Sequence, residues 1–367
     1  MISTDRMLAD IRRLVETESP TESLPHCWGV AEVTQQICGQ WLASPARIEE
    51  HEGRPILRWG TAQPRILLLG HLDTVWPLGT LERLPWSCDG ERLRGPGVFD
   101  MKAGVMTAIA ALSMVTERSA IGLMLTTDEE TGSWASRTAI AEAIGKAEAV
   151  LVFEPSLQGK LKSARKGTSW YRINFTGRAA HAGLDPERGV NALLMAAQCA
   201  AEVVAFADST QGSTVTPTML TAGTTANTVP AEAELVIDVR AWSLAEQQRI
   251  DDAIRACALA ATSEVGSVDI RGGIDRPAMS QQASATLLPR VQQAAMRLGL
   301  PVPEHSAVGG ASDGNLTAAA GIPTLDGLGP CGDGAHADHE WVSVADLVPR
   351  TELIAALLTD LVGGQGH

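Results

Sequence analysis

Three short apolar runs, each ending in acidic residues or a histidine, constrain the fold of this chain most strongly. They are RILLLGHLDTV (65–75), IGLMLTTDEE (121–130) and VLVFEP (150–155). A continuous apolar run of this length is typical of a strand that is buried on both faces of a parallel sheet. Segments with the apolar spacing of helices lie between them, at 101–117 and 133–146. This alternation predicts an α/β domain whose parallel or mixed sheet is covered by helices on both faces.

The middle of the chain has a different pattern, in which polarity alternates along the strands. Six elements are predicted there in the order strand, helix, strand, strand, helix, strand, at 168–177, 188–207, 214–223, 231–240, 244–264 and 267–273. This order is that of a ferredoxin-like α+β domain. We therefore expect a catalytic domain in two parts, residues 1–166 and 278–367, interrupted by an inserted domain at 167–277.

Length and composition exclude several classes of protein. A chain of 367 residues is long enough for two domains. Its formal net charge of −14 argues against a nucleic-acid partner. No apolar run approaches the roughly 20 residues of a membrane-spanning helix. The first residues, MISTDRMLADIRRLVE, contain no apolar signal core. We therefore expect a cytoplasmic protein without a membrane partner.

Several candidate metal ligands follow the predicted strands. His71 and Asp73 end the first run, three acidic residues (128–130) end the second, and Glu154 ends the third. Asp100 closes the loop RGPGVFD. Because the carboxyl ends of parallel strands meet at one edge of a sheet, these side chains should converge. Grouped carboxylates repel one another, and a divalent cation relieves that repulsion.

The type of ligand indicates the type of metal. Imidazole and carboxylate without thiolate suit zinc or a similar ion in an open catalytic site. None of the six cysteines belongs to a CxxC pair, so a thiolate zinc site is not expected. Each motif alone has a simpler interpretation, such as a solvated acidic turn or a hydrogen-bonded histidine. The loop GPGVFD lacks the third glycine of a dinucleotide-binding loop.

Five motifs in order resemble one enzyme family. They are GHLDTV, GPGVFDMKAG, TTDEETGS, FEP and GDGAHADHE, and the predicted inserted domain adds GRAAHAG and ANTVPAEAELVIDVR. Together they resemble the two-zinc family of glutamate carboxypeptidases, aminoacylases, acetylornithine deacetylase and succinyl-diaminopimelate desuccinylase. The resemblance covers essentially the whole chain and is greatest to the folate-cleaving glutamate carboxypeptidases. It implies a zinc-peptidase catalytic domain and a ferredoxin-like inserted domain that serves as dimerisation domain and lid.

The resemblance implies two zinc ions per subunit, with cobalt or manganese as possible substitutes. His71, Asp100 and Glu154 would bind one ion. Asp100, Glu130 and His336 would bind the other, so that Asp100 bridges the two.

The resemblance also implies catalytic and substrate-binding roles. Asp73 would orient His71, and Glu129 would be the general base. His181 would reach the active site of the partner subunit in a homodimer. Contacts with the substrate would come from Asn227, Arg240, Arg276 and Gly310.

The function implied is hydrolysis of an amide bond next to an amino acid with a free carboxylate. The substrate would be a small molecule, either an N-acyl amino acid or a short peptide-like amide. An N-acyl-amino-acid deacylase remains open as an alternative because both enzymes cut beside an α-carboxylate. An aminopeptidase would need an acidic subsite for an ammonium group, whereas Arg240 and Arg276 indicate an anion. A catalytically silent binding protein would be expected to lack Glu129 or Asp100.

Overall fold

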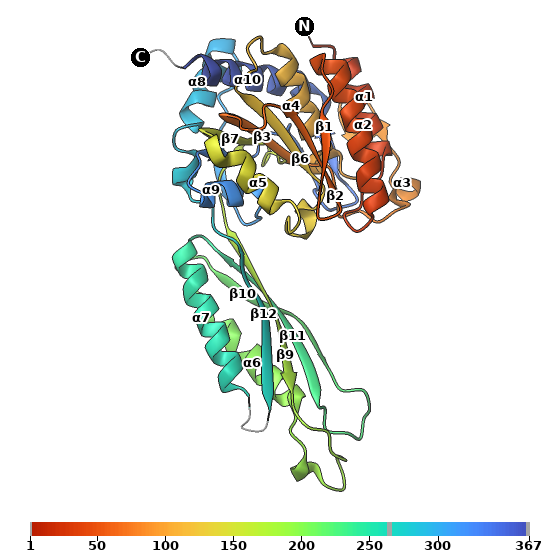
Figure 1. The fold of residues 1–367 in the computed structure, drawn as a ribbon, viewed down its shortest axis with the longest axis vertical. Helices are drawn as coiled ribbons and strands as arrows, with labels where there is room; N and C mark the ends of the chain where they lie inside the picture. The colour runs from red at the N-terminus through yellow and green to blue at the C-terminus, as the bar shows by residue number, and fades with distance from the viewer. Residues whose placement is uncertain (1, 263–265, 365–367) are drawn as a thin grey trace. The chain divides into compact units, whose positions relative to one another are not determined.

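The computed structural model describes residues 2–262 and 266–364, which form two compact units (Figure 1). The first unit contains the described residues within Met1–Ala164, Ser280–Val308 and Ser312–His367. The second contains those within Arg165–Met279 and Gly309–Ala311.

The first unit is built on a mixed six-stranded sheet, which confirms the predicted α/β class. Its strands, in spatial order, are β1 (Arg47–His51), β2 (Arg54–Gly60), β6 (Ile121–Thr126), β3 (Ile66–His71), β7 (Ala149–Val152) and β14 (Thr324–Leu325). The last four run parallel, whereas β1 and β2 are antiparallel. The hairpin β1–β2 was not predicted because its strands are rich in charged residues. A two-residue turn, Glu52-Gly53, with positive φ at both positions joins them.

Helices cover both faces of this sheet. One face packs against α1 (Thr4–Glu16), α2 (Leu24–Leu42), α4 (Ala103–Met114), α8 (Leu288–Leu298) and α10 (Val344–Gly363). The opposite face packs against α5 (Arg137–Ala143) and α9 (Asp313–Ala319), and Figure 1 shows α5 in front of the sheet. Successive side chains of a strand point to opposite faces. Accordingly Ile66 and Leu68 of β3 join the first core, and Leu67 and Leu69 join the second.

Shorter elements complete the first unit. A helix α3 (Thr80–Arg83) lies between β3 and β4, and a small sheet contains β15 (Gly332–Asp333), β16 (Trp341–Ser343), β5 (Arg92–Arg94) and β4 (Ser87–Cys88). A further pair joins β13 (His305–Val308) to β8 (Leu161–Arg165). No helix of the described residues is both long enough and apolar enough to cross a bilayer.

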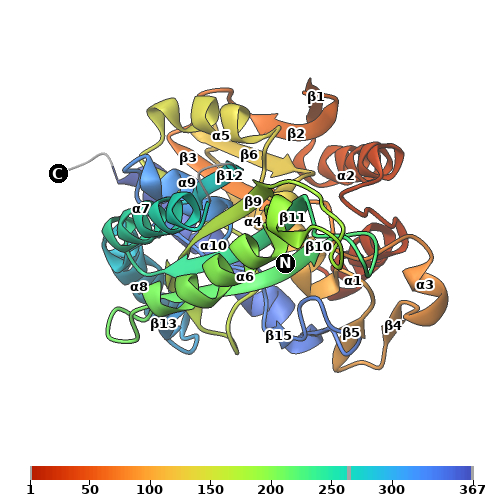
Figure 2. The ribbon, with the colours of Figure 1, turned by 90° about the horizontal axis from the view of Figure 1, so that it is seen from below.

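The second unit has the predicted element order. It contains β9 (Gly167–Thr176), α6 (Ala192–Val203), β10 (Thr214–Ala222), β11 (Glu232–Ala241), α7 (Leu244–Ala260) and β12 (Ser267–Arg276). The antiparallel sheet has the order β10-β11-β9-β12. Helices α6 and α7 pack on the face that carries Tyr171, Ile173 and Phe175 of β9 (Figure 2). The predicted helix 244–264 extends to residues 263 and 264, which lie outside the described residues.

Candidate metal centre

Neighbouring parallel strands bring the candidate ligands to one edge of the six-stranded sheet. His71 is the last residue of β3, which lies between β6 and β7. Glu129 and Glu130 follow β6 after two residues, and Glu154 follows β7. Asp100 lies at a kink in the segment Val98–Lys102 directly before α4, where its own backbone is not helical, and its peptide bond to Met101 is cis.

Two histidines share the carboxylate of Asp100. The Nε2 atom of His71 lies 3.4 Å from Asp100 Oδ1 and 3.5 Å from Glu154 Oε1. The Nε2 atom of His336 lies 3.1 Å from Asp100 Oδ2 and 3.3 Å from Glu130 Oε2. The structure therefore brings together five side chains as two sets of three, with one oxygen of Asp100 facing each imidazole.

Asp73 contacts more than His71, the residue that the family resemblance implied it would orient. The Nδ1 atom of His71 lies 3.0 Å from the main-chain oxygen of Asp73 and 3.5 Å from its Oδ1 atom. The fully buried carboxylate accepts hydrogen bonds from the hydroxyl of Thr21 (2.7 Å) and from the backbone N–H groups of Glu129 (3.3 Å) and Glu130 (3.2 Å). Asp73 thus orients both the imidazole and the turn that carries the two glutamates.

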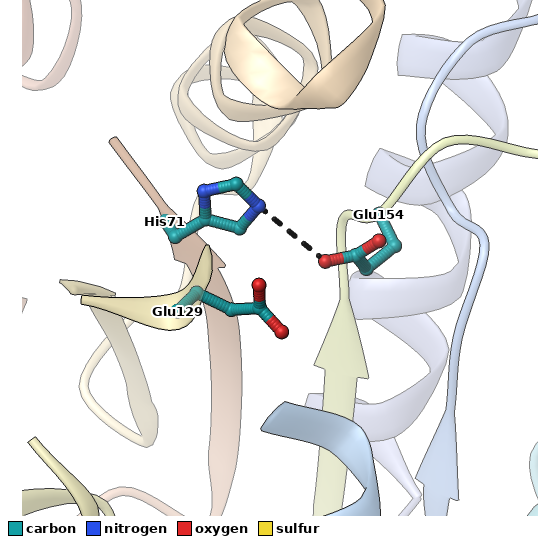
Figure 3. Close-up of side chains that lie close together, drawn as sticks. All are labelled: His71, Glu129 and Glu154. Carbon is teal, nitrogen blue, oxygen red and sulfur yellow. Dashed lines mark ion pairs between the residues drawn. The ribbon is translucent and has the colours of Figure 1, made fainter. Parts of the chain in front are cut away.

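Glu129 lies beside the cluster on the side of Glu154. Figure 3 shows its carboxylate extending into the space between His71 and Glu154. One oxygen or nitrogen atom from each of these three side chains lies within 4.8 Å of the others. Glu129 is only 7% exposed. Distance alone would therefore let Glu129 act as a metal ligand or as a base beside the metal.

The electrostatics of the cluster follow from burial and from the paired imidazoles. Burial opposes ionisation of Asp100, but His336 and His71 outweigh it and hold the pKa of Asp100 below its usual range. Burial raises the pKa of Glu130, and repulsion from Asp100 adds to this. Hydrogen bonding to Asp100 and Glu130 raises the pKa of His336 to about 10. Burial disfavours protonation of His71, yet its carboxylate neighbours raise its pKa well above the usual value.

These groups fit a pair of divalent cations. Among the residues that the structure describes, the buried atoms Asp100 Oδ1 and Glu130 Oε1 accept no hydrogen bond. A buried carboxylate oxygen without a partner is costly unless a cation or donor faces it. The donors are imidazole nitrogens and carboxylate oxygens, which suit zinc-type ions.

The remaining predicted residues belong to the second unit. The loops that carry His181 and Asn227 are joined by backbone hydrogen bonds from Ala182 N to Asn227 O (2.9 Å) and from Val229 N to Ala180 O (2.9 Å). The Nδ1 atom of exposed His181 accepts hydrogen bonds from the backbone N–H groups at positions 183 and 184. These contacts hold the ring on its own loop.

The two arginines differ in exposure. Arg240 donates from Nε and NH2 to both carboxylate oxygens of Asp238, at 2.8 to 3.2 Å. The side chain of Arg240 is partly exposed, whereas Arg276 is buried. Gly310 is exposed, and its carbonyl accepts a hydrogen bond from Arg165.

One buried carboxylate near the cluster received no role in the sequence analysis. Glu340 accepts hydrogen bonds from the backbone that leads to Asp100. Burial raises its pKa to about 7 in spite of these donors. Its only sequence signal is its place four residues after His336.

Comparison with known proteins decides the family. The profile of the peptidase family M20/M25/M40 matches residues 67–360. The chain belongs to this family. It is accordingly a hydrolase of a metallopeptidase family, as the order of its motifs predicted.

Named relatives within this family differ in activity. Carboxypeptidase G2 from Pseudomonas sp. (strain RS-16) is 30% identical over 318 residues, which cover 83% of this chain and 76% of that protein. Succinyl-diaminopimelate desuccinylase 2 from Shewanella loihica is 27% identical over 80% of this chain and 84% of its own. The crystal structure of aminopeptidase PepT from Bacillus cereus superposes with a TM-score of 0.78 at 20% identity, over 98% of this chain and 99% of that one. The last similarity shows the shared fold alone.

Proposed function

We propose that this protein hydrolyses an amide bond next to an amino acid with a free carboxylate, with two zinc ions per subunit. One observation carries the proposal. A single carboxylate, that of Asp100, is shared by two imidazole–carboxylate sets, and a further buried carboxylate, Glu129, lies beside them. Cobalt or manganese could replace zinc, because the same donors suit these ions.

Each side chain has a distinct task in this proposal. His71, Asp100 and Glu154 would hold one ion, and Asp100, Glu130 and His336 would hold the other. The ions, when bound, would act as Lewis acids and would lower the pKa of water to about 7.

Glu129 would move the proton during the reaction. Its carboxylate would take a proton from the attacking water and deliver it to the leaving amine, because an amide anion is a very poor leaving group. Asp73 supports this task, since its carboxylate accepts a hydrogen bond from the backbone of Glu129 and so fixes the turn. A carboxylate can shuttle the proton only if it is not bound to metal, so the proposal requires Glu129 to stay off the ions.

The second unit would supply the contacts with the substrate. We propose that residues 167–277 form an inserted dimerisation and lid domain, and that the protein is a homodimer. Arg240 would bind the substrate carboxylate through the NH1 edge of its guanidinium, because Asp238 engages the Nε–NH2 edge. Asn227, Arg276 and Gly310 would supply further contacts, and His181 would stabilise the oxyanion in the partner subunit.

The similarity to two kinds of relative supports two candidate activities. The similarity to carboxypeptidase G2 favours a carboxypeptidase, and the resemblance of the motifs to glutamate carboxypeptidases favours glutamate as the residue released. The similarity to succinyl-diaminopimelate desuccinylase favours the alternative, an N-acyl-amino-acid deacylase. Both reactions leave a free amino acid whose carboxylate the enzyme must recognise.

A substrate panel tests the proposal. Protein stripped with a chelator and reloaded with zinc or cobalt would be assayed on N-acyl amino acids, on N-blocked dipeptides ending in glutamate, on the matching C-terminal carboxamides and on dipeptides with a free amine. We expect hydrolysis of substrates with a free carboxylate, little on the carboxamides, and none without metal. Full activity in metal-free protein, or a requirement for a free amine, would overturn the proposal.

A further inference from the structure

Glu340 accepts four hydrogen bonds through one buried carboxylate. Its Oε1 atom accepts from the backbone N–H groups of Phe99 (2.8 Å) and Asp100 (2.9 Å). Its Oε2 atom accepts from the backbone N–H of Gly97 (2.9 Å) and from Nε1 of Trp76 (3.0 Å). Glu340 is 3% exposed, so these donors replace water almost completely.

The donors come from two segments that carry candidate metal ligands. Backbone positions 97, 99 and 100 form the turn that presents the Asp100 side chain. Trp76 follows the segment of His71 and Asp73. Glu340 itself lies four residues after His336. One carboxylate therefore connects three of the chain segments that meet at the metal centre.

The backbone N–H groups of the turn before Asp100 converge on this carboxylate. Gly97 has a φ of +73°, and a Cβ atom there would lie 2.6 Å from Cγ2 of Thr74. The turn is thus a tight, glycine-dependent conformation whose N–H groups point to one place. Converging backbone N–H groups form a site for an anion, which here is the side chain of Glu340. The buried ammonium group of Lys102 adds attraction to the same carboxylate.

The histidine loop also needs an anchor. His336 has a φ of +63° and a side chain that is 49% exposed, so packing alone holds the ring weakly. The backbone bonds Ala337 N to Gly334 O and Glu340 N to Ala337 O, both 2.9 Å, make the loop compact from Gly334 to Glu340. Glu340 thus ends the compact loop that carries His336 and also binds the turn that carries Asp100, and His336 Nε2 lies 3.1 Å from Asp100 Oδ2.

We propose that Glu340 is a positioning residue that holds Asp100 and His336 at the separation that a shared divalent cation requires. The inference rests on the metal centre of the proposed function. Substitution of Glu340 should weaken metal binding even though Glu340 contributes no ligand atom. Residues that orient metal ligands typically affect metal affinity by about 10–100-fold.

The test measures zinc affinity by competition with a chromophoric chelator, and the visible absorption of the cobalt form. Glu340→Gln keeps the size of the side chain but replaces one accepting oxygen with an NH2 group, which faces backbone donors. We expect about 10–100-fold weaker zinc binding and altered cobalt absorption. Trp76→Phe removes one of the four donors and should weaken binding by a smaller factor.

A buried carboxylate in the second unit provides the matched control. Glu246 is 7% exposed and accepts hydrogen bonds from the hydroxyl of Ser213 and from Arg249. Glu246→Gln should lower thermal stability without changing zinc affinity or the cobalt spectrum.

The outcomes separate this inference from the proposed function. If the parent protein binds no divalent cation, the proposed metal centre fails and this inference fails with it. If the parent binds zinc and Glu340→Gln binds it equally well with the same cobalt spectrum, only the positioning role is refuted. If Glu340→Gln cannot be obtained folded, parent-like zinc affinity in Trp76→Phe refutes that role.

Discussion

The close approach of α4 to the end of β7 determines whether Asp100 and Glu154 can face the same imidazole. Gly104 lies in the first turn of α4, four residues after Asp100, and a Cβ atom built on it would lie only 2.1 Å from the backbone oxygen of Phe153. An ordinary contact needs 3.4 Å, so Gly104→Ala would force the two backbones about 1.3 Å apart. Because Phe153 precedes Glu154, this displacement would also separate the metal ligands.

The magnitude follows from two opposing effects. Overpacking a tight interior costs about 1–3 kcal/mol, and the upper end applies here because a backbone oxygen cannot rotate away. Alanine gains about 0.5–1 kcal/mol over glycine within a helix. We therefore expect Gly104→Ala to reduce the free energy of unfolding by about 2 kcal/mol. Gly29 in α2 is the matched control, because a Cβ atom there would meet nothing within 4 Å. Gly29→Ala should stabilise the protein by about 0.5–1 kcal/mol.

Urea unfolding of the metal-free variants, followed by circular dichroism, measures both changes. Metal must be absent because a ligand that binds only the folded state adds apparent stability. Zinc titration of the folded variants then shows whether Gly104→Ala also weakens metal binding. Equal stabilities for Gly104→Ala and the parent would refute the argument that this contact is tight.

Three further predictions test the roles of individual residues. Glu129→Ala should keep its metal but lose roughly 100-fold or more in kcat, as expected for a missing general base, whereas Asp100→Ala should lose metal by elemental analysis. Arg240→Ala should lower kcat/KM about 10–100-fold for substrates with a free carboxylate and little for the matching carboxamides, a loss typical of a charge-assisted contact. Inactive Glu129→Ala and inactive His181→Ala proteins should regain activity when their subunits exchange, because one site of a mixed dimer would then contain neither substitution.

For each of these predictions, a specific result would contradict it. Loss of metal from Glu129→Ala would make Glu129 a ligand, which the distances also permit. If Asp238→Asn reproduces the effect of Arg240→Ala, the ion pair between these residues is structural. Parent-like rates for His181→Ala, or no recovery despite demonstrated exchange, would remove the shared-site proposal.

The sequence by itself determined the fold class, the order of elements in the second unit and the family. Apolar runs and alternating polarity are local properties, so they reveal buried and half-exposed strands without knowledge of their partners. The ordered motifs identified the family, because His71, Asp100 and Glu154 each stand in a recognisable local sequence pattern. The hairpin β1–β2 was not predicted, because charged side chains obscure the polarity pattern of its strands.

Only the tertiary structure decided how the side chains are held. Asp73 binds the turn of Glu129 and Glu130 as well as His71, and Glu340 binds a backbone turn 240 residues away in the chain. Arg240 lies in an ion pair with Asp238 that spacing alone could not distinguish from a substrate contact. The contacts of Asp73 and Glu340 depend on which distant segments the fold brings within about 3 Å, and hydrogen bonds between distant segments leave no periodic signal in the sequence.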